Sequence, residues 1–89
     1  MNKTMILGIM VHDRIKEAGK TQKVLSIHAP IITTRLGFHE LTTDVCSRMG
    51  FILIVLNGSL EQNKILTDDL AQIGGIEVQV MQFQKEYLP

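Results

Sequence analysis

Three consecutive polar residues, His12-Asp13-Arg14, directly follow the apolar run from Met5 to Val11. If that run is a strand and a helix begins after Asp13, the turn between them offers backbone N–H groups at a helix N-terminus, together with the Arg14 guanidinium. Such a turn can hold a small anionic ligand. The alternative is that Asp13 caps the helix, with His12 and Arg14 in solvent. Both interpretations stay open, and His12, Asp13 and Arg14 are the candidate effector-binding residues.

Catalytic chemistry has little support in the sequence. No Ser or Cys lies in a recognisable nucleophile turn, and no glycine-rich phosphate loop precedes a helix. Asp68 and Asp69 are adjacent on a predicted helix, where neighbouring side chains point about 100° apart. They therefore do not form a catalytic carboxylate pair. We expect the protein not to be an enzyme, and the sequence does not identify a cofactor.

Composition narrows the class of protein further. The 89 residues are enough for one small domain, residues 1–89. Nine basic side chains balance nine acidic ones, so the charge that direct nucleic-acid binding requires is missing. The longest apolar run, Phe51 to Leu56, is six residues, whereas a membrane-spanning helix needs about 18–20. With the single cysteine Cys46 and no disulfide to form, we expect a cytoplasmic protein without membrane contact.

Four segments read as strands. Residues 5–11 and 51–56 are continuously apolar, as in strands covered on both faces. Residues 31–38 are rich in β-branched residues and follow a proline. Residues 76–83 alternate and then shift phase, which a bulge or an edge position would explain. Residues 39–49 are polar and are predicted to be a hairpin connection or a widened loop.

Two segments read as helices. The first is predicted over about 14–26, with one face formed by Ile15, Ala18, Gln22 and Leu25. The second begins at about Leu60, because Ser59 and Gln62 form a capping box. Gly74-Gly75 is predicted to end it as a glycine cap. Its apolar stripe is Leu66, Leu70 and Ile73, and its solvent face includes Glu61, Lys64, Asp68 and Gln72.

The element order is strand, helix, strand, strand, helix, strand. This order predicts an α+β, ferredoxin-like βαββαβ fold, with a four-stranded antiparallel sheet and two helices on one face. Right-handed crossovers place the first and third strands in the sheet interior, which agrees with their apolar composition. The second sheet face stays uncovered unless another subunit packs on it. We therefore expect a dimer or tetramer assembled through sheets.

The edge formed by the second strand offers a further interface. Thr33, Arg35 and Gly37 are the candidate interface residues, since an unpaired edge strand can pair with the same strand of a second subunit. Alternatively, Arg35 keeps the edge soluble and Gly37 marks a bend or bulge.

Three segments of the chain resemble a known family, the iron-only hydrogenase system regulators, which are small proteins with an ACT-like fold. The segments are Ile6-Leu7-Gly8-Ile9-Met10-Val11 with Asp13-Arg14, Arg35-Leu36-Gly37-Phe38, and Ala71-Gln72-Ile73-Gly74-Gly75-Ile76-Glu77-Val78. The resemblance spans nearly the whole chain. It implies a single ACT-like regulatory domain in a bacterial cytoplasm, acting through a small-molecule effector or a partner protein. A further possibility is a structural adaptor that contacts its partner through Tyr87 and Leu88.

The segment around Cys46 invites a second comparison. The sensing domain of nickel-responsive repressors is also ACT-like and binds metal through a His, a His-x-His eleven residues later and then a Cys. Here His28 is followed eleven residues later by His39, and Cys46 lies seven residues beyond. Two imidazoles and a thiolate suit nickel, copper or zinc. The similarity implies a metal-sensing alternative with His28, His39 and Cys46 as ligands in a site shared across subunits. Otherwise the histidines have no special role, and Cys46 packs as a small hydrophobe.

Overall fold

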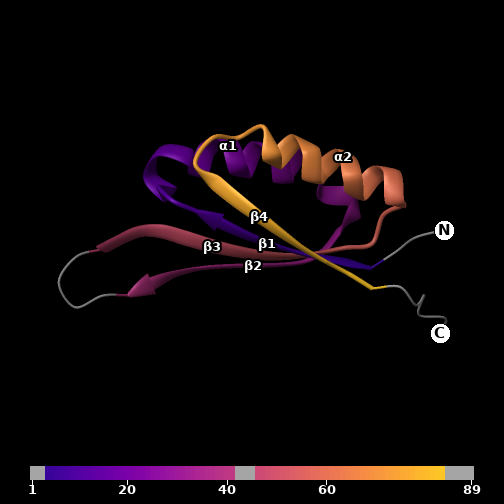
Figure 1. Cartoon of the computed structure of the whole chain (residues 1–89), viewed down its shortest axis with the longest axis horizontal. Helices are drawn as coiled ribbons and strands as arrows, with labels where there is room; N and C mark the ends of the chain where they lie inside the picture. Colours follow the sequence, from indigo (N-terminus) through magenta and orange to yellow (C-terminus); the bar gives the residue numbers. More distant parts are fainter. Residues whose placement is uncertain (1–3, 42–45, 84–89) are drawn as a thin grey trace.

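The fold is known from a computed structural model that describes residues 4–41 and 46–83. Within these residues four strands form one antiparallel sheet in the order β2-β3-β1-β4, and two helices cover one face of it (Figure 1). The ferredoxin-like α+β fold predicted from the sequence is therefore confirmed. Neither helix has the length and apolarity to cross a bilayer. The elements are β1 Met5–Val11, α1 Arg14–Ile27, a short 3₁₀ turn Ala29–Ile31, β2 Ile32–Leu41, β3 Cys46–Leu56, α2 Leu60–Ala71 and β4 Ile76–Gln82.

β1 is the central element of the sheet. It pairs with β3 on one side and with β4 on the other, and both registers run without a break. The interior placement of β1 and β3 is confirmed. β4 is an edge strand, so the edge explanation of its phase shift is correct and the bulge explanation is wrong. Beyond β4 the pairing continues for one more bond, in which the backbone N–H of Phe83 donates to the carbonyl of Thr4 over 3.3 Å.

The connection between β2 and β3 is shorter than the sequence indicates. β2 continues to Leu41 and β3 begins at Cys46, which faces Leu41 in the register. The prediction of a loop over 39–49 is wrong for residues 39–41 and 46–49, and residues 42–45 lie outside the described chain. The prediction relied on apolar runs. Backbone hydrogen bonds hold a two-stranded ladder together whatever its side chains are, so polar residues can extend it.

The hydrophobic core lies between the sheet and the helices. Alternate residues of β1 point into it, as the period of two in a strand requires. The stripe predicted for α2 is confirmed, since its three members are buried, and its predicted solvent face is exposed. The core consists of Met5, Leu7, Ile9, Val11, Leu25, Ile54, Leu56, Leu66, Leu70 and Ile73.

The face that α1 buries agrees with the predicted one at Leu25 and in part at Ala18, and it differs at Ile15 and Gln22. Ile15 is 69% exposed and Gln22 is exposed, whereas Glu17 and Thr21 are buried in line with Leu25. These three residues are spaced at i, i+4 and i+8 and therefore share a face. The Thr21 hydroxyl donates to the carbonyl of Glu17 over 3.0 Å, which satisfies it within the helix. A pattern search restricted to apolar residues does not find such a face.

The two ends of α2 have different caps. At its start the predicted capping box is present, because the Gln62 N–H donates to Ser59 Oγ over 3.1 Å and the Ser59 N–H donates to Gln62 Oε1 over 2.9 Å. At its end the predicted glycine cap is wrong. The cap residue is Gln72, and the Ile73 N–H closes the last turn on the Leu70 carbonyl. The left-handed φ of 80° occurs at Gly75, where the chain reverses into β4.

Asn63 is a fully buried amide in α2, and it holds the chain as it leaves β3. Its Oδ1 accepts from the backbone N–H of Gly58 over 3.1 Å, and its Nδ2 donates to the Gly58 carbonyl over 3.4 Å. A Cβ on Gly58 would lie 2.9 Å from Asn63 Oδ1 and 3.0 Å from Ile31 Cγ2. Position 58 therefore has no room for a side chain.

Candidate functional site

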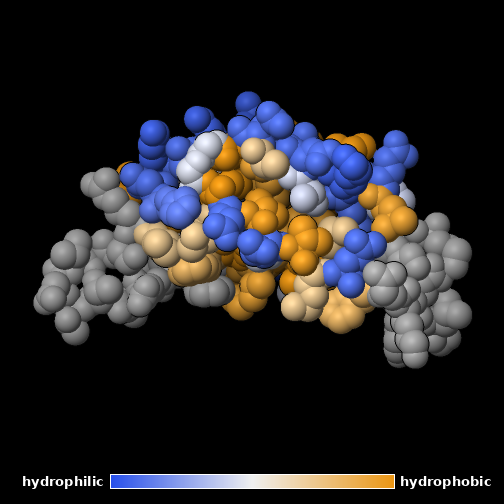
Figure 2. Space-filling model, in the orientation of Figure 1, coloured by the Kyte–Doolittle hydropathy of each residue, from blue (hydrophilic) through white to orange (hydrophobic). Residues whose placement is uncertain are grey.

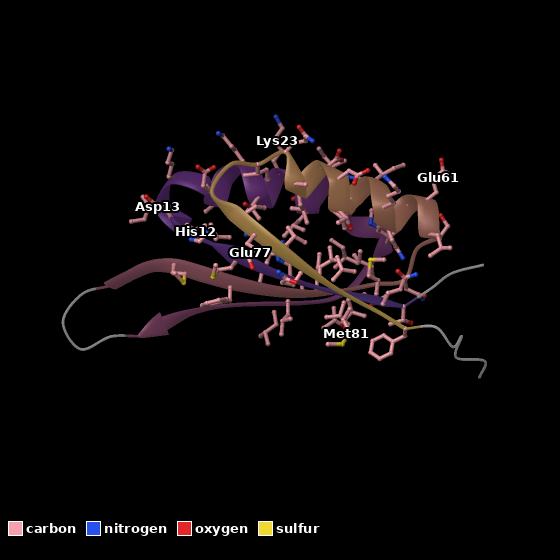
Figure 3. All side chains as sticks on the ribbon, in the orientation of Figure 1. His12, Asp13, Lys23, Glu61, Glu77 and Met81 are labelled. Carbon is pink, nitrogen blue, oxygen red and sulfur yellow. The ribbon has the colours of Figure 1, made fainter. Side chains whose placement is uncertain are left out.

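The turn before α1 is a capped helix start, and the side chains of its His12 and Asp13 are labelled in Figure 3. Asp13 is the N-cap residue, and its Oδ1 accepts from the backbone N–H groups of Ile15 at 3.1 Å and Lys16 at 3.2 Å. The cap predicted at Asp13 is therefore confirmed. His12 is exposed, and its backbone N–H donates to the Gly75 carbonyl over 2.9 Å. The side chain of Arg14 lies outside the described part. The anion site stays a prediction. Two of the backbone N–H groups that it would use, those of Ile15 and Lys16, already donate to Asp13.

The three candidate interface residues lie on the edge strand β2, and each has different contacts. Thr33 sits at a register shift, and its hydroxyl donates to the Val55 carbonyl over 3.2 Å. Arg35 points toward the helices, where its guanidinium donates to Gln22 of α1. Gly37 pairs regularly with Ile52, so the idea that it marks a bulge is wrong. The register of β2 against β3 shifts instead between Ile32 and Thr34 and between His39 and Leu41. Pairing of this edge with a second copy stays a prediction.

The three candidate metal ligands lie on three different elements, at the end of α1, on β2 and on β3. His28 lies at the end of α1, where its Nε2 is 2.7 Å from Oδ2 of Asp69 in α2. His39 faces Gly50 and Cys46 faces Leu41 in the far part of the hairpin, and their side chains are not described. At about 3.3 Å per residue, His39 lies about 23 Å along β2 from Ile32. His28 and His39 of one copy therefore do not share an ion, and a site would need two copies.

Within the described ranges, no group of three or more His, Cys, Asp or Glu side chains is close enough to hold a metal ion. The metal site stays a prediction that depends on residues of a second subunit. Tyr87 and Leu88, the candidate adaptor contacts, lie outside the described residues.

The most prominent surface feature is the face of the sheet that the helices leave open, which we call the open face. Hydrophilic side chains gather over the helices and hydrophobic ones over the sheet beneath them (Figure 2). Met81 points away from the helices on this side (Figure 3). Leu36, Leu53 and Met81 are exposed, although they are large and apolar. Ile6, Met10, Phe51 and Val55 share the face by strand alternation and are partly buried.

The open face has a shallow hollow over the middle of β1. The hollow has a volume of about 300 Å³ and forms where Gly8 presents no side chain between β3 and β4. Its floor and walls are almost entirely apolar. Its polar groups come from β4, where Gln79 Nε2 donates to Glu77 Oε2 over 3.1 Å. The lining on this face is Gly8, Met10, Phe51, Leu53, Glu77 and Gln79.

The sequence predicted an uncovered sheet face but not the residues on it. β1 and β3 are apolar at nearly every position, so alternation could not separate their two faces. One signal was available: Gly8 interrupts the most apolar strand, and a glycine inside a strand often marks a close approach to a ligand or another chain.

Comparison with known proteins identifies the fold and not a family. No family model matches the sequence, and no curated protein does. The uncharacterized protein TM1266 from Thermotoga maritima superposes with a TM-score of 0.81 at 25% identity, covering 94% of this chain and 100% of that one. A functionally unknown protein from Pediococcus pentosaceus gives 0.54 at 13% identity, covering 99% of both chains.

A third solved structure has bound molecules. CPII from Thiomonas intermedia K12, a nitrogen regulatory PII-like protein, was solved with ADP, AMP and acetate. It superposes on this chain with a TM-score of 0.50 at 12% identity, covering 93% of this chain and 90% of that one. At this identity the likeness establishes a shared fold.

Proposed function

We propose that this protein is a small, non-catalytic regulatory module that assembles with copies of itself through the open face of its sheet and responds to a small effector. The observation that carries the proposal is the open face, where Leu36, Leu53 and Met81 lie exposed beside partly buried apolar neighbours. A contiguous apolar surface of this kind marks an interaction site in a water-soluble protein.

The size of the hydrophobic gain indicates a reversible assembly. Leu36, Leu53 and Met81 are 56%, 41% and 57% exposed. Complete burial of such a side chain is worth about 1.5–3 kcal/mol, so covering the exposed parts stabilises by about 2–5 kcal/mol per copy and twice that in a pair. Association costs about 4–15 kcal/mol. The two terms are of similar size, so we expect a weak, reversible association that depends on protein concentration.

A second copy is the partner that the charges favour. The chain has zero net charge, so two copies do not repel each other at long range. Among the described residues of the open face, Glu77 is the one charged side chain, and it lies on the edge strand β4. A two-fold axis that lies between two open faces places the same patch on both sides of the interface, which closes the assembly without leaving a free apolar face.

A sequence resemblance and a structural similarity support the regulatory part of the proposal. The sequence resembles iron-only hydrogenase system regulators, and CPII, which shares the fold, was solved with nucleotides bound. We therefore propose a bacterial cytoplasmic regulator of such a system that acts through its effector or a partner protein. Deleting the coding sequence in its host should change hydrogenase activity, and unchanged activity would reject that system as the target.

The assembly is tested by sedimentation equilibrium of the full chain and two lysine variants. Leu53→Lys puts a charge on the open face, whereas Ile65→Lys puts one on α2, where Ile65 is 47% exposed. We expect Leu53→Lys to weaken self-association by about tenfold or more, since both copies lose apolar area. Ile65→Lys should associate like the wild type. A wild-type monomer at high concentration, or equal association of both variants, would reject the open face as the interface.

A further inference from the structure

The glycine at the floor of the hollow is not required by the backbone. Gly8 pairs with Leu53 on one side and Gln79 on the other, inside registers that run without a break, so it marks no bulge. It is not in the left-handed region, since Gly75 is the described glycine with positive φ. A Cβ at position 8 would find its nearest neighbour, Leu53 Cδ2, at 3.9 Å, an ordinary contact. An alanine would fit, yet a glycine keeps the space empty.

Glycine rather than alanine at position 8 lowers the stability of the fold. A glycine in a strand interior is less favourable than alanine, because it loses more conformational freedom on folding. With a bulge and a turn excluded, the remaining common reason for a strand glycine is close approach by a ligand or another chain.

The lining of the hollow indicates which ligand fits. Met10, Phe51 and Leu53 provide an apolar floor, and the carboxylate of Glu77 lies at the side, where the Gln79 amide donates to one of its oxygens. Among the residues that the structure describes, none in the lining has a basic side chain. The volume of about 300 Å³ is at the lower end for small-molecule pockets. A compact apolar molecule with one positively charged, hydrogen-bond-donating group complements both the shape and the charge.

We propose that the hollow over Gly8 binds a small organic amine, with its apolar body on Met10, Phe51 and Leu53 and its ammonium group at Glu77. The inference deepens the proposed function and rests on it in one respect, since a second copy packed on the open face covers the hollow. The amine then lies between the subunits, and removal of water around it strengthens its interaction with Glu77. Ligand binding and assembly are thereby coupled.

The test uses phenethylamine as the probe and 2-phenylethanol as its neutral match, each titrated into the full chain and followed by NMR chemical shifts. We expect millimolar binding of the amine, at least about tenfold tighter than that of the alcohol. Glu77→Gln should remove this preference, because it keeps a hydrogen-bonding group of similar shape without the charge. Gly8→Ala should weaken amine binding by about tenfold or more, because its methyl group occupies the floor.

Gly19→Ala is the matched control, because Gly19, in α1, also has open space at its Cβ but lies away from the hollow. It should bind the amine like the wild type. Gly8→Ala should remain at least as stable as the wild type in urea, so loss of binding would not reflect unfolding. Equal binding of amine and alcohol, or unchanged binding by Gly8→Ala, would overturn the inference.

Sedimentation of the same samples separates this inference from the proposed function. An assembled protein that does not bind the amine overturns the amine site and leaves self-association standing. A monomeric protein that binds the amine with the expected pattern of variants supports the site and rejects the assembly. Tighter amine binding at protein concentrations where the dimer forms would support both, together with their coupling.

Discussion

Replacing Asn63 with leucine tests whether the buried amide holds the chain between β3 and α2. Leucine is similar in shape but lacks the oxygen that accepts from the Gly58 N–H and the amide that donates to the Gly58 carbonyl. Gly58 is itself buried, so water does not replace the lost partners. The change therefore removes two hydrogen bonds without opening a large cavity.

The expected cost follows from the two peptide groups left unpaired. Each buried polar group without a partner costs about 1–3 kcal/mol, so Asn63→Leu should lower the free energy of unfolding by roughly 2–4 kcal/mol, after partial relaxation. A domain of this size is stable by about 4–13 kcal/mol. The variant should therefore still fold at 25 °C while unfolding at a clearly lower urea concentration.

Urea denaturation followed by circular dichroism provides the measurement. The midpoint should fall while the dependence of the unfolding free energy on urea stays unchanged, because the folded surface is the same. Asn57→Leu is the matched control, since Asn57 is exposed one residue before Gly58 and should change stability by less than about 0.5 kcal/mol. If Asn63→Leu cost no more than this control, the reasoning from the two hydrogen bonds would be refuted.

Three further predictions concern the helices. Asp13→Ala should lower the free energy of unfolding by about 0.5–2 kcal/mol in urea, because α1 loses its cap; no loss would show that the cap is not stabilising. A double-mutant cycle on His28 and Asp69 should give a coupling below about 1 kcal/mol, since Asp69 is half exposed; a larger value would contradict a surface pair. The Asp68 carboxylate accepts from Lys64 Nζ and raises the pKa of Lys64 above 10.5, so its contribution is present below pH 10.5 and is lost as pH rises through the folded-state pKa. An NMR titration of Asp68→Asn should show the pKa of Lys64 falling, and an unchanged pKa would exclude Asp68 as its cause.

The fold was predictable because local signals and topology agree. β1 was predicted to its residue bounds from one apolar run, and the capping box located the start of α2. The errors arose where polar residues enter structure for reasons that apolar patterns do not contain. The far part of the β2–β3 hairpin is held by backbone pairing, and Thr21 is buried because its hydroxyl bonds within α1.

The candidate site was predictable only in outline. Two helices cannot cover both faces of one sheet, so an open face followed from the element order. Which side chains lie on that face depends on strand register, and β1 and β3 are too uniformly apolar to reveal it. The roles of His28 and Arg35 depended on partners in other elements, Asp69 in α2 and Gln22 in α1, which no spacing along the chain predicts.

The hydrogen bond from Phe83 to Thr4 brings the two ends of the described chain together at one end of the sheet, opposite the β2–β3 hairpin (Figure 1). A short linker could join them, and new ends could be opened at Gly74, which is exposed and has open space around it. In that circular permutant β4 would precede β1 as one arm of a local hairpin, and the sheet would keep the same three strand pairings. The contacts between β1 and β4, which now join distant parts of the chain, would become local. Folding should therefore be faster. The division of this fold into two βαβ halves is therefore a property of where the chain is cut, and the sheet itself does not require it.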